Sequence, residues 1–400
     1  MSLIKVTFVL IKPNGGTKPM NKKELAEIKK NFNDTSALFT LNRIVTVYID
    51  GNKNIRCKKN DLHINYPEEE RSVLMESLGK IFKGNLGKGL LEYAFPSAEY
   101  EEDGAQHTLY TAMKTKLADE EAVDKLIVRI VNNLAYEPSY TLMIGHCSYS
   151  IITKDKNDEA LDDSASEYNF IVAAVCPANT SDDGLMFDNE NNTIIKKANT
   201  ELIISREPTD GFFFPVFTDR RPDVNSVMYF TKSPKKPNIS VVDDVLGCEF
   251  VMSAHGEKET FQAVLNDVVG DELSYNVITQ LNEKIQEFVT GSKNEPGLPI
   301  IDDKKMYNLL SDVGVSDEKL EALPSVYKQK VGDGGVLTAT NLVENKTTLA
   351  TPEITVNISK NATDKVRTTM IEGRRCLLID LDDPAISING LTTRITGNTI

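Results

Sequence analysis

The stretch that decides the fold is YTLMIGHCSYSIIT (Tyr140–Thr153), a long run rich in apolar and β-branched residues with no proline. Three further apolar runs follow it along the chain: YNFIVAAVC (Tyr168–Cys176), GFFFPVF (Gly211–Phe217) and SVMYFT (Ser226–Thr231). Acidic, Asn-rich or Pro-rich loops separate these runs. Strands that cluster without intervening helices are typical of antiparallel pairing. The centre of the chain therefore predicts an antiparallel sheet.

Helices are expected on both sides of these strands. Before them, apolar residues at helical spacing predict helices that begin near Asn21, Pro67 and Asp119. After them, helical spacing returns over residues 257–288. Helices bury their apolar faces against a sheet, so the expected fold class is α+β. It consists of a central, mostly antiparallel sheet flanked by helices, with a small C-terminal helix-plus-strand unit.

A basic β-hairpin is expected within the N-terminal helical region. Ile44–Ile49 is rich in β-branched residues, and Asp50-Gly51 is a strong turn signal before a second strand near Ile55. Four cations belong to this hairpin, and three lysines follow further along the chain: Lys53, Arg56, Lys58 and Lys59, then Lys80, Lys83 and Lys88. They could form one basic patch. The alternative is an ordinary solvated face.

The end of the chain is predicted to be a separate unit. Gly291–Pro299 holds glycine, serine and proline and is the best linker candidate. Two short helices and a small terminal sheet around Glu372-Gly373 are expected beyond it. The predicted domains are 20–138, the N-terminal helical region with the hairpin; 139–290, the central sheet with helices; and 300–391, the C-terminal helices and small sheet. We expect Met20 to be the natural start and residues 1–19 to be a disordered extension.

Composition restricts the function. The chain has 45 Lys and Arg against 59 Asp and Glu, a net charge of −14 at pH 7, which opposes binding to nucleic acid phosphates. Its scattered cysteines form no CxxC pair, which argues against a zinc ribbon or a disulfide framework and favours a reducing cytoplasm. No apolar run is long enough for a signal peptide or a membrane helix. We therefore expect a cytoplasmic protein with no membrane contact, no metal and no cofactor.

Gly79–Gly89 is rich in glycine and lysine and invites comparison with a phosphate-binding loop. That motif would need a glycine where Phe82 stands and a serine or threonine where Gly89 stands. We interpret the stretch as the end of a helix, capped by Gly84, and a loop.

His146 and Cys147 are adjacent, but consecutive side chains of a strand point to opposite faces, so they cannot act on each other. Two alternatives stay open: Cys147 pairs with His107 or His255, or His146 pairs with Cys176. We favour a third interpretation, in which these are small buried cysteines on apolar strands.

Asp219-Arg220-Arg221-Pro222-Asp223, between two apolar strands, is the most suggestive stretch for binding. Two arginines held rigidly at the rim of a sheet could grip a phosphate or a partner's carboxylate. The alternative is that Asp219 and Asp223 neutralise them in a solvated turn. We predict that Arg220, Arg221 and Asp219 form the binding surface.

Five segments together resemble a bacterial family of clostridia and their relatives that is known only as a domain of unknown function, number four-three-one-seven. They are MNKKELAEI (Met20–Ile28), FIVAAVCP (Phe170–Pro177), GFFFPVFTDRR (Gly211–Arg221), SVMYFTK (Ser226–Lys232) and GRRCLLIDL (Gly373–Leu381). The likeness covers Met20 to Leu391 and implies no reaction. In the order of its elements the chain is also similar to the bacterial nucleoid-associated protein family, and that likeness assigns no DNA-binding residue.

Two classes of function follow. We expect a non-enzymatic cytoplasmic binding protein with a protein partner, through which it could attach to the nucleoid, because the net charge disfavours direct binding to nucleic acid. The alternative is a hydrolase or transferase with an unrecognised active site in the central sheet domain. A Cys147 or Cys176 thiol within hydrogen-bond reach of a histidine in a deep polar pocket would favour the alternative.

Overall fold

The computed structural model describes residues 19–394 except 137, 152–165, 181–184, 189–190, 197–201, 293–294, 296–297, 345, 360–361, 381–384 and 389–390. These residues form two compact units, one that extends to Lys258 and one that covers 259–293 and everything from Pro299. The division differs from the expected boundaries at 139 and 300. The predicted N-terminal region and the central strands build one sheet together, and the second unit begins within a helix before the linker candidate. The fold class is α+β, as predicted.

The main sheet belongs to the N-terminal unit and has eight strands. They are β1 (Phe39–Ile49), β2 (Ile55–Leu62), β3 (Leu90–Ala94), β4 (Tyr140–Ile151), β5 (Ser166–Thr180), β8 (Leu202–Ile204), β9 (Asp210–Phe214) and β12 (Ser226–Thr231). Their order is β2-β1-β4-β5-β9-β12-β3, with β8 paired to the end of β5. All these pairings are antiparallel, which confirms the predicted sheet.

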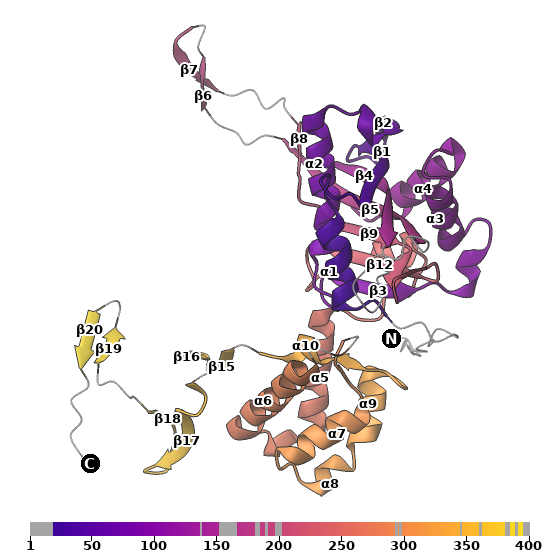
Figure 1. Cartoon of the computed structure of the whole chain (residues 1–400). Helices are drawn as coiled ribbons and strands as arrows, with labels where there is room; N and C mark the ends of the chain where they lie inside the picture. Colours follow the sequence, from indigo (N-terminus) through magenta and orange to yellow (C-terminus); the bar gives the residue numbers. More distant parts are fainter. Residues whose placement is uncertain are drawn as a thin grey trace, which may run out of the picture. The chain divides into compact units, whose positions relative to one another are not determined.

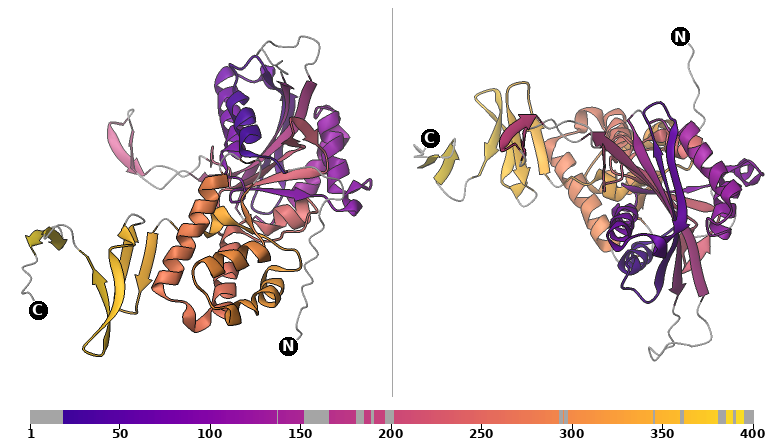
Figure 2. Two further views of the ribbon diagram at one scale, coloured as in Figure 1. Left: turned by 60° about the horizontal axis from the view of Figure 1, so that its bottom comes forward. Right: turned by 90° about the horizontal axis from the view of Figure 1, so that it is seen from above.

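Helices cover both faces of this sheet (Figures 1 and 2). They are α1 (Lys22–Asn31) and α2 (Glu68–Gly79) on one face, and α3 (Ala105–Lys114) and α4 (Glu120–Asn133) on the other. Along β4, Leu142 and Ile144 enter the core beneath α3 and α4, whereas Met143 and Cys147 enter the core beneath α1 and α2. Because β4 is buried on both faces, nearly every residue along it is apolar or small.

Local signals fix the helix starts. Asn21 caps α1 by accepting from the Lys23 and Glu24 amides, and the Glu24 carboxylate accepts from the Asn21 amide in return. Asp119 caps α4 in a similar way. Both starts confirm the predictions. The expected pattern missed α3 and the edge strand β3, which are short and lack strong flanking signals.

Smaller elements complete the N-terminal unit. They are the strand pairs β6 (Leu185–Asp188) with β7 (Thr193–Lys196) and β10 (Val216–Thr218) with β11 (Arg221–Asp223), and the turns η1 (His63–Asn65), η2 (Lys80–Lys83), η3 (Ser97–Tyr100) and η4 (Val241–Val245). The 182–192 stretch, expected to be a loop, contains β6. The other long polar connection, 155–163, lies outside the described residues. Arg129 of α4 ties two of these elements and the loop before α3 together, since it donates to the carbonyl of Val245 in η4, to the carbonyl of Asp103 in the loop and to the Glu99 carboxylate in η3.

The C-terminal unit has a helical core of its own. Its elements are α5 (Ala254–Val268), η5 (Gly270–Glu272), α6 (Tyr275–Gly291), β13 (Ile300–Ile301), α7 (Asp303–Asp312), α8 (Asp317–Leu320), α9 (Leu323–Val331), β14 (Leu337–Thr338) and α10 (Ala339–Leu342). Buried Met306, Leu310 and Tyr327 lie in this core. The linker candidate is occupied in part by the end of α6, and 293–294 and 296–297 within it lie outside the described residues.

The predicted terminal sheet is instead three separate strand pairs. They are β15 (Lys346–Ala350) with β16 (Thr355–Ser359), β17 (Val366–Ile371) with β18 (Arg374–Ile379), and β19 (Ala385–Ile388) with β20 (Leu391–Arg394). Each strand pairs with its neighbour in the chain because a short loop costs little entropy to close. Among the helices that the structure describes, none is both long and apolar enough to cross a bilayer.

Candidate functional site

The predicted binding residues Asp219, Arg220 and Arg221 lie at the tip of the β10–β11 hairpin. Asp219 and Arg220 have left-handed backbone conformations, with φ of 47° and 55°, as a two-residue turn between antiparallel strands requires. All three residues are exposed. The structure therefore presents them together on one surface turn.

Arg220 has a partner from a distant part of the chain. Its Nη2 donates to Glu27 Oε1 of α1 at 2.8 Å, and the Tyr149 hydroxyl donates to the same oxygen at 2.8 Å. For Arg221 the described residues supply no ion pair. Of the two arginines, Arg221 is therefore the freer to meet a partner.

Asp223 does not serve as the counter-ion that one alternative assigned to it. It is buried, and its carboxylate accepts from the Asn225 amide and the Ser226 hydroxyl, each at 3.0 Å. These bonds hold the chain as it enters β12. Glu27 supplies a carboxylate to Arg220 instead.

The sheet separates Cys147 and Cys176 from His146 and His107. Cys147 and Cys176 are buried beneath α1 and α2, and burial raises the pKa of Cys176 to about 12. His146 lies on the opposite face of β4 from Cys147, and His107 belongs to α3, which covers that opposite face. His255 is exposed. Among the described contacts, neither Cys147 nor Cys176 therefore meets a histidine as a nucleophile meets its base.

His146 is a buried structural histidine. Its Nδ1 lies 3.1 Å from Asn42 Nδ2, and its side chain has no exposed surface. Burial, helped by the positive charge of Lys116, lowers the pKa of His146 to about 4. Over the described ranges, no cluster of three or more His, Cys, Asp or Glu side chains is placed to hold a metal ion.

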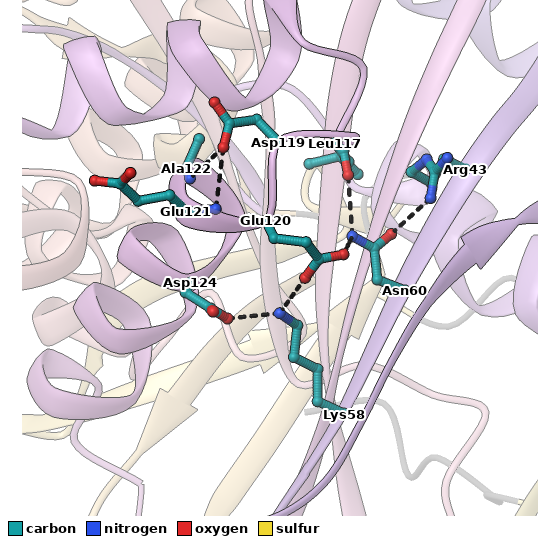
Figure 3. A network of polar contacts seen from close by, with 9 residues as sticks. All are labelled: Arg43, Lys58, Asn60, Leu117, Asp119, Glu120, Glu121, Ala122 and Asp124. Carbon is teal, nitrogen blue, oxygen red and sulfur yellow. Dashed lines mark hydrogen bonds and ion pairs between the residues drawn. The ribbon is translucent and has the colours of Figure 1, made fainter.

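The cations of the predicted basic hairpin are mostly engaged within the fold. Lys58 Nζ lies 2.6 Å from both Glu120 Oε2 and Asp124 Oδ1 of α4 (Figure 3). Next to it, Asn60 donates to Glu120 Oε1 and to the Leu117 carbonyl (Figure 3). This network joins the edge strand β2 to the start of α4.

The other hairpin cations also have local contacts. Arg56 pairs with Asp50 at 2.6 Å, and Lys53 donates to the Asn132 carbonyl at 3.1 Å. Lys59 points to the opposite face from Lys58, and its ammonium lies 3.7 Å from the centre of the Tyr66 ring. Strand alternation therefore divides the predicted patch between two faces of the sheet.

The remaining lysines of that patch converge on a second place. A cavity of about 330 Å³ is lined by Lys80, Lys83, Lys88 and Lys232, together with Glu207. We call it the lysine pocket. Lys83 and Lys232 are exposed and Lys88 is half-buried, and no described carboxylate forms an ion pair with any of the three. In a chain of net charge −14, this is a local concentration of positive charge.

The backbone holds the lysines in place. The turn η2 carries Lys80 and Lys83, and after it the Asn85 carbonyl accepts from the amides of Lys88 and Gly89, both at 3.0 Å. The Thr231 amide then donates to the Gly89 carbonyl at 2.9 Å, which fastens the loop to the end of β12 beside Lys232. A Cβ at position 89 would lie 3.1 Å from the Thr231 carbonyl oxygen, so glycine suits this close approach.

A chain of ion pairs runs beside the lysine pocket. Lys80 Nζ lies 2.6 Å from Glu207 Oε1 and 3.1 Å from Glu76 Oε1, and Glu76 Oε2 lies 3.6 Å from Arg206 Nη1. Burial disfavours the charge of Lys80, but the two carboxylates outweigh it and raise the pKa of the ammonium. The hydrogen bond from Lys80 lowers the pKa of Glu207. Both ions of this central pair are charged at neutral pH.

The sequence indicates only part of this pocket. The Gly79–Gly89 run is visible in it, and the spacing of that run does not fit the phosphate-loop motif. Gly84 directly follows η2, but its φ of −61° is ordinary and not the left-handed cap expected. Lys232 and Glu207 were missed because they are brought in by β12 and by the chain before β9, and no local signal marks them.

A family model described as "Domain of unknown function (DUF4317)" matches residues 20–391. The chain belongs to the DUF4317 family. The predicted family resemblance is thus confirmed, and the family's description states no activity. Neither the curated proteins nor the solved structures gave a match. For this DUF4317 chain, the chemistry of its own surfaces is therefore the guide to function.

Proposed function

We propose that this DUF4317 chain is a non-enzymatic binding protein and that its lysine pocket binds a small phosphate-bearing ligand. The observation that carries the proposal is the presence of three lysines, Lys83, Lys88 and Lys232, without ion-pair partners among the described residues, around one cavity of about 330 Å³. Hydrogen bonds from ammonium groups to phosphate oxygens are among the stronger polar contacts in proteins. A fourth lysine, Lys80, is already shared with Glu207.

A small ligand fits these features better than nucleic acid does. A duplex would bring many phosphates towards a surface whose overall charge of −14 opposes their binding. A single phosphate or pyrophosphate group would meet the lysines and little of the acidic surface. The cavity's size also suits a compact molecule.

The test is calorimetric titration of the full chain with inorganic pyrophosphate at about 0.15 M salt. Substitution of Lys83, Lys88 and Lys232 by methionine should weaken binding about tenfold or more, because each lysine supplies a charge-assisted contact. The matched control replaces Lys22, Lys23 and Lys30 with methionine. These lysines are exposed on α1, and their substitution makes the same change in net charge. Equal loss in both triple variants would mean that only overall charge matters, and would overturn the proposal.

Two further measurements separate the other functions expected from the sequence. Release of orthophosphate from pyrophosphate or ADP by the wild-type chain would favour the hydrolase alternative. Tighter binding of a short DNA duplex than of pyrophosphate at the same salt concentration would favour direct attachment to the nucleoid. We expect neither result.

We also keep the Asp219–Arg221 turn as the proposed surface for a protein partner. The supporting observation is that Arg221 is exposed and has no ion pair within the described part of the chain. With a confirmed partner in hand, Arg221→Ala should weaken binding about tenfold if that partner offers a carboxylate. Unchanged affinity would remove this surface from consideration.

A further inference from the structure

A second, chemically different cavity lies in the N-terminal unit, between α2 and the chain that follows β8. It encloses about 480 Å³ and we call it the apolar pocket. Its floor is made of two rows of side chains on neighbouring strands, because Lys59 pairs with Thr46 and Thr46 with Met143, while Cys57 pairs with Tyr48 and Tyr48 with Thr141. Its walls include Val73 and Leu74 of α2 and Ile204 of β8.

The interior of the apolar pocket suits a hydrocarbon or aromatic body. Tyr66, Leu74 and Met143 are buried core residues that also line it. One polar atom on the floor has no hydrogen-bond partner among the described residues. It is Thr141 Oγ1, which is buried. A buried hydroxyl without a partner is costly, so a ligand group that met it would be stabilised.

The rim of the apolar pocket has cations that can still bind an anionic group. Lys59 lies over the Tyr66 ring, and no described carboxylate forms an ion pair with it. Among the described residues, Arg206, also at the rim, has only a long pair with Glu76. The two acids of the rim, Glu69 and Glu70, stand in the first turn of α2, where the helix dipole already stabilises negative charge. The rim thus carries two acids and two cations, and Lys59, in the floor row of Thr46 and Met143, is the cation without a carboxylate partner among the described residues.

We infer that the apolar pocket binds an amphiphilic monocarboxylate, such as a medium-chain fatty acid. The carboxylate would meet Lys59 and Arg206, and the apolar tail would lie along Val73, Leu74 and Met143. A cavity of this size holds a ligand of that class. This inference does not depend on the lysine pocket, because it uses different residues and a different ligand chemistry.

The experiment measures displacement of a dansyl-tagged fatty acid from the full chain by decanoate, decanol and decylamine. Decanoate should displace the probe best, with decylamine at least tenfold weaker. Val73→Trp, which places a large ring in the cavity, should abolish binding of all three. Lys59→Met should weaken decanoate at least fivefold and leave decanol unchanged, whereas Lys53→Met, the same change in the same hairpin, should alter neither.

A second measurement uses the thiol of Cys57, which is exposed and lines the cavity. Decanoate should slow the alkylation of Cys57 by iodoacetamide, and should not slow that of Cys376 in the C-terminal unit. Binding that survives Val73→Trp, or that leaves Cys57 unprotected, would overturn the inference. Stronger binding of decylamine than of decanoate would overturn the carboxylate assignment.

Discussion

Lys58 and Arg56 of the β1–β2 hairpin carry the same charge as Lys83 and Lys88 of the lysine pocket but differ from them in what faces them. Lys58 has two carboxylates at 2.6 Å, and Arg56 has one. Lys83 and Lys88 have none among the residues described. Cations of the first kind hold elements together, and cations of the second kind are available to a ligand. The number of lysines in a stretch of sequence does not show which kind a cation is. Whether a distant segment of the chain supplies a carboxylate partner decides it.

Arg129 is the clearest example of a cation that holds elements together. Its side chain is only 20% exposed, as is that of its partner Glu99. Arg129→Met would remove three hydrogen bonds and leave the Glu99 carboxylate half-buried without its cation. We expect the free energy of unfolding to fall by about 3 kcal/mol. Urea denaturation measures the loss. A decrease below about 1 kcal/mol would show that Arg129 does not hold these elements together.

His146 shows what happens to a basic side chain that is buried without a carboxylate. Its pKa is lowered to about 4 in the folded chain by burial, against about 6.5 in the unfolded chain. Between these two values the unfolded state binds the extra proton, so stability falls as the pH decreases from about 6.5 to about 4. Lowering the pH from 7 to 5 should cost about 2 kcal/mol through this residue.

To isolate this effect, the unfolding free energy of the wild type is measured against that of the His146→Gln variant, whose side chain at this position cannot titrate. As the pH is lowered from 7 to 5, the stability of the wild type relative to the variant should fall by about 2 kcal/mol. A difference that stays constant with pH would contradict the lowered pKa of His146.

Lys58 lies between these extremes, because its side chain is 26% exposed. Lys58→Met should reduce the free energy of unfolding by about 1 kcal/mol, since it leaves Glu120 and Asp124 close together without their shared cation. Thermal or urea unfolding at low and high salt checks this. The defect should diminish as salt screens the two carboxylates, and a defect that grows with salt would point to lost packing instead.

Arg220 and Arg221, in the β10–β11 hairpin, should differ less in their effect on the free energy of unfolding. Arg220→Ala removes a partly exposed pair with Glu27, so we expect a loss of about 0.5 kcal/mol. Arg221→Ala should change stability by less than that. Urea denaturation of both single variants decides the order, and a larger loss for Arg221 would show a structural role that its exposure does not indicate.

The smallest effect on folding is expected in the lysine pocket. Lys83→Met should change the unfolding free energy by no more than about 0.5 kcal/mol, because an exposed cation without a partner contributes little. The same unfolding assay as for Lys58→Met makes the contrast direct. Marked destabilisation by Lys83→Met would place Lys83 with the structural cations and weaken the case for a binding role.

The sequence was sufficient for those features that depend on nearby residues. The capping residues Asn21 and Asp119, the Asp50-Gly51 turn and the apolar, β-branched run of β4 are all local signals, and each one predicted its element correctly. The α+β class followed from the clustering of strands. The short β3 and α3 were missed because their signals are weak, and the domain boundary was misplaced because pairing of β1 with β4 crosses it.

The candidate sites were harder to predict because they depend on pairings between distant segments. Nothing near Arg220 indicates that Glu27 is its partner, 193 residues away. Likewise Lys58 and Lys59 are adjacent in the sequence, but register and strand alternation send one to α4 and the other to the apolar pocket. Charge composition could show that cations are scarce, and only the fold shows which of them remain free.

The ion-pair chain Arg206–Glu76–Lys80–Glu207 runs from one cavity to the other, since Arg206 lines the apolar pocket and Lys80 and Glu207 line the lysine pocket. A phosphate that drew Lys80 away from its carboxylates would leave Glu76 to bind Arg206 more closely. Arg206 would then be less available to a carboxylate ligand. Thermodynamic reciprocity requires the second ligand to oppose the first by the same factor. If both ligands bind, each would therefore weaken the binding of the other.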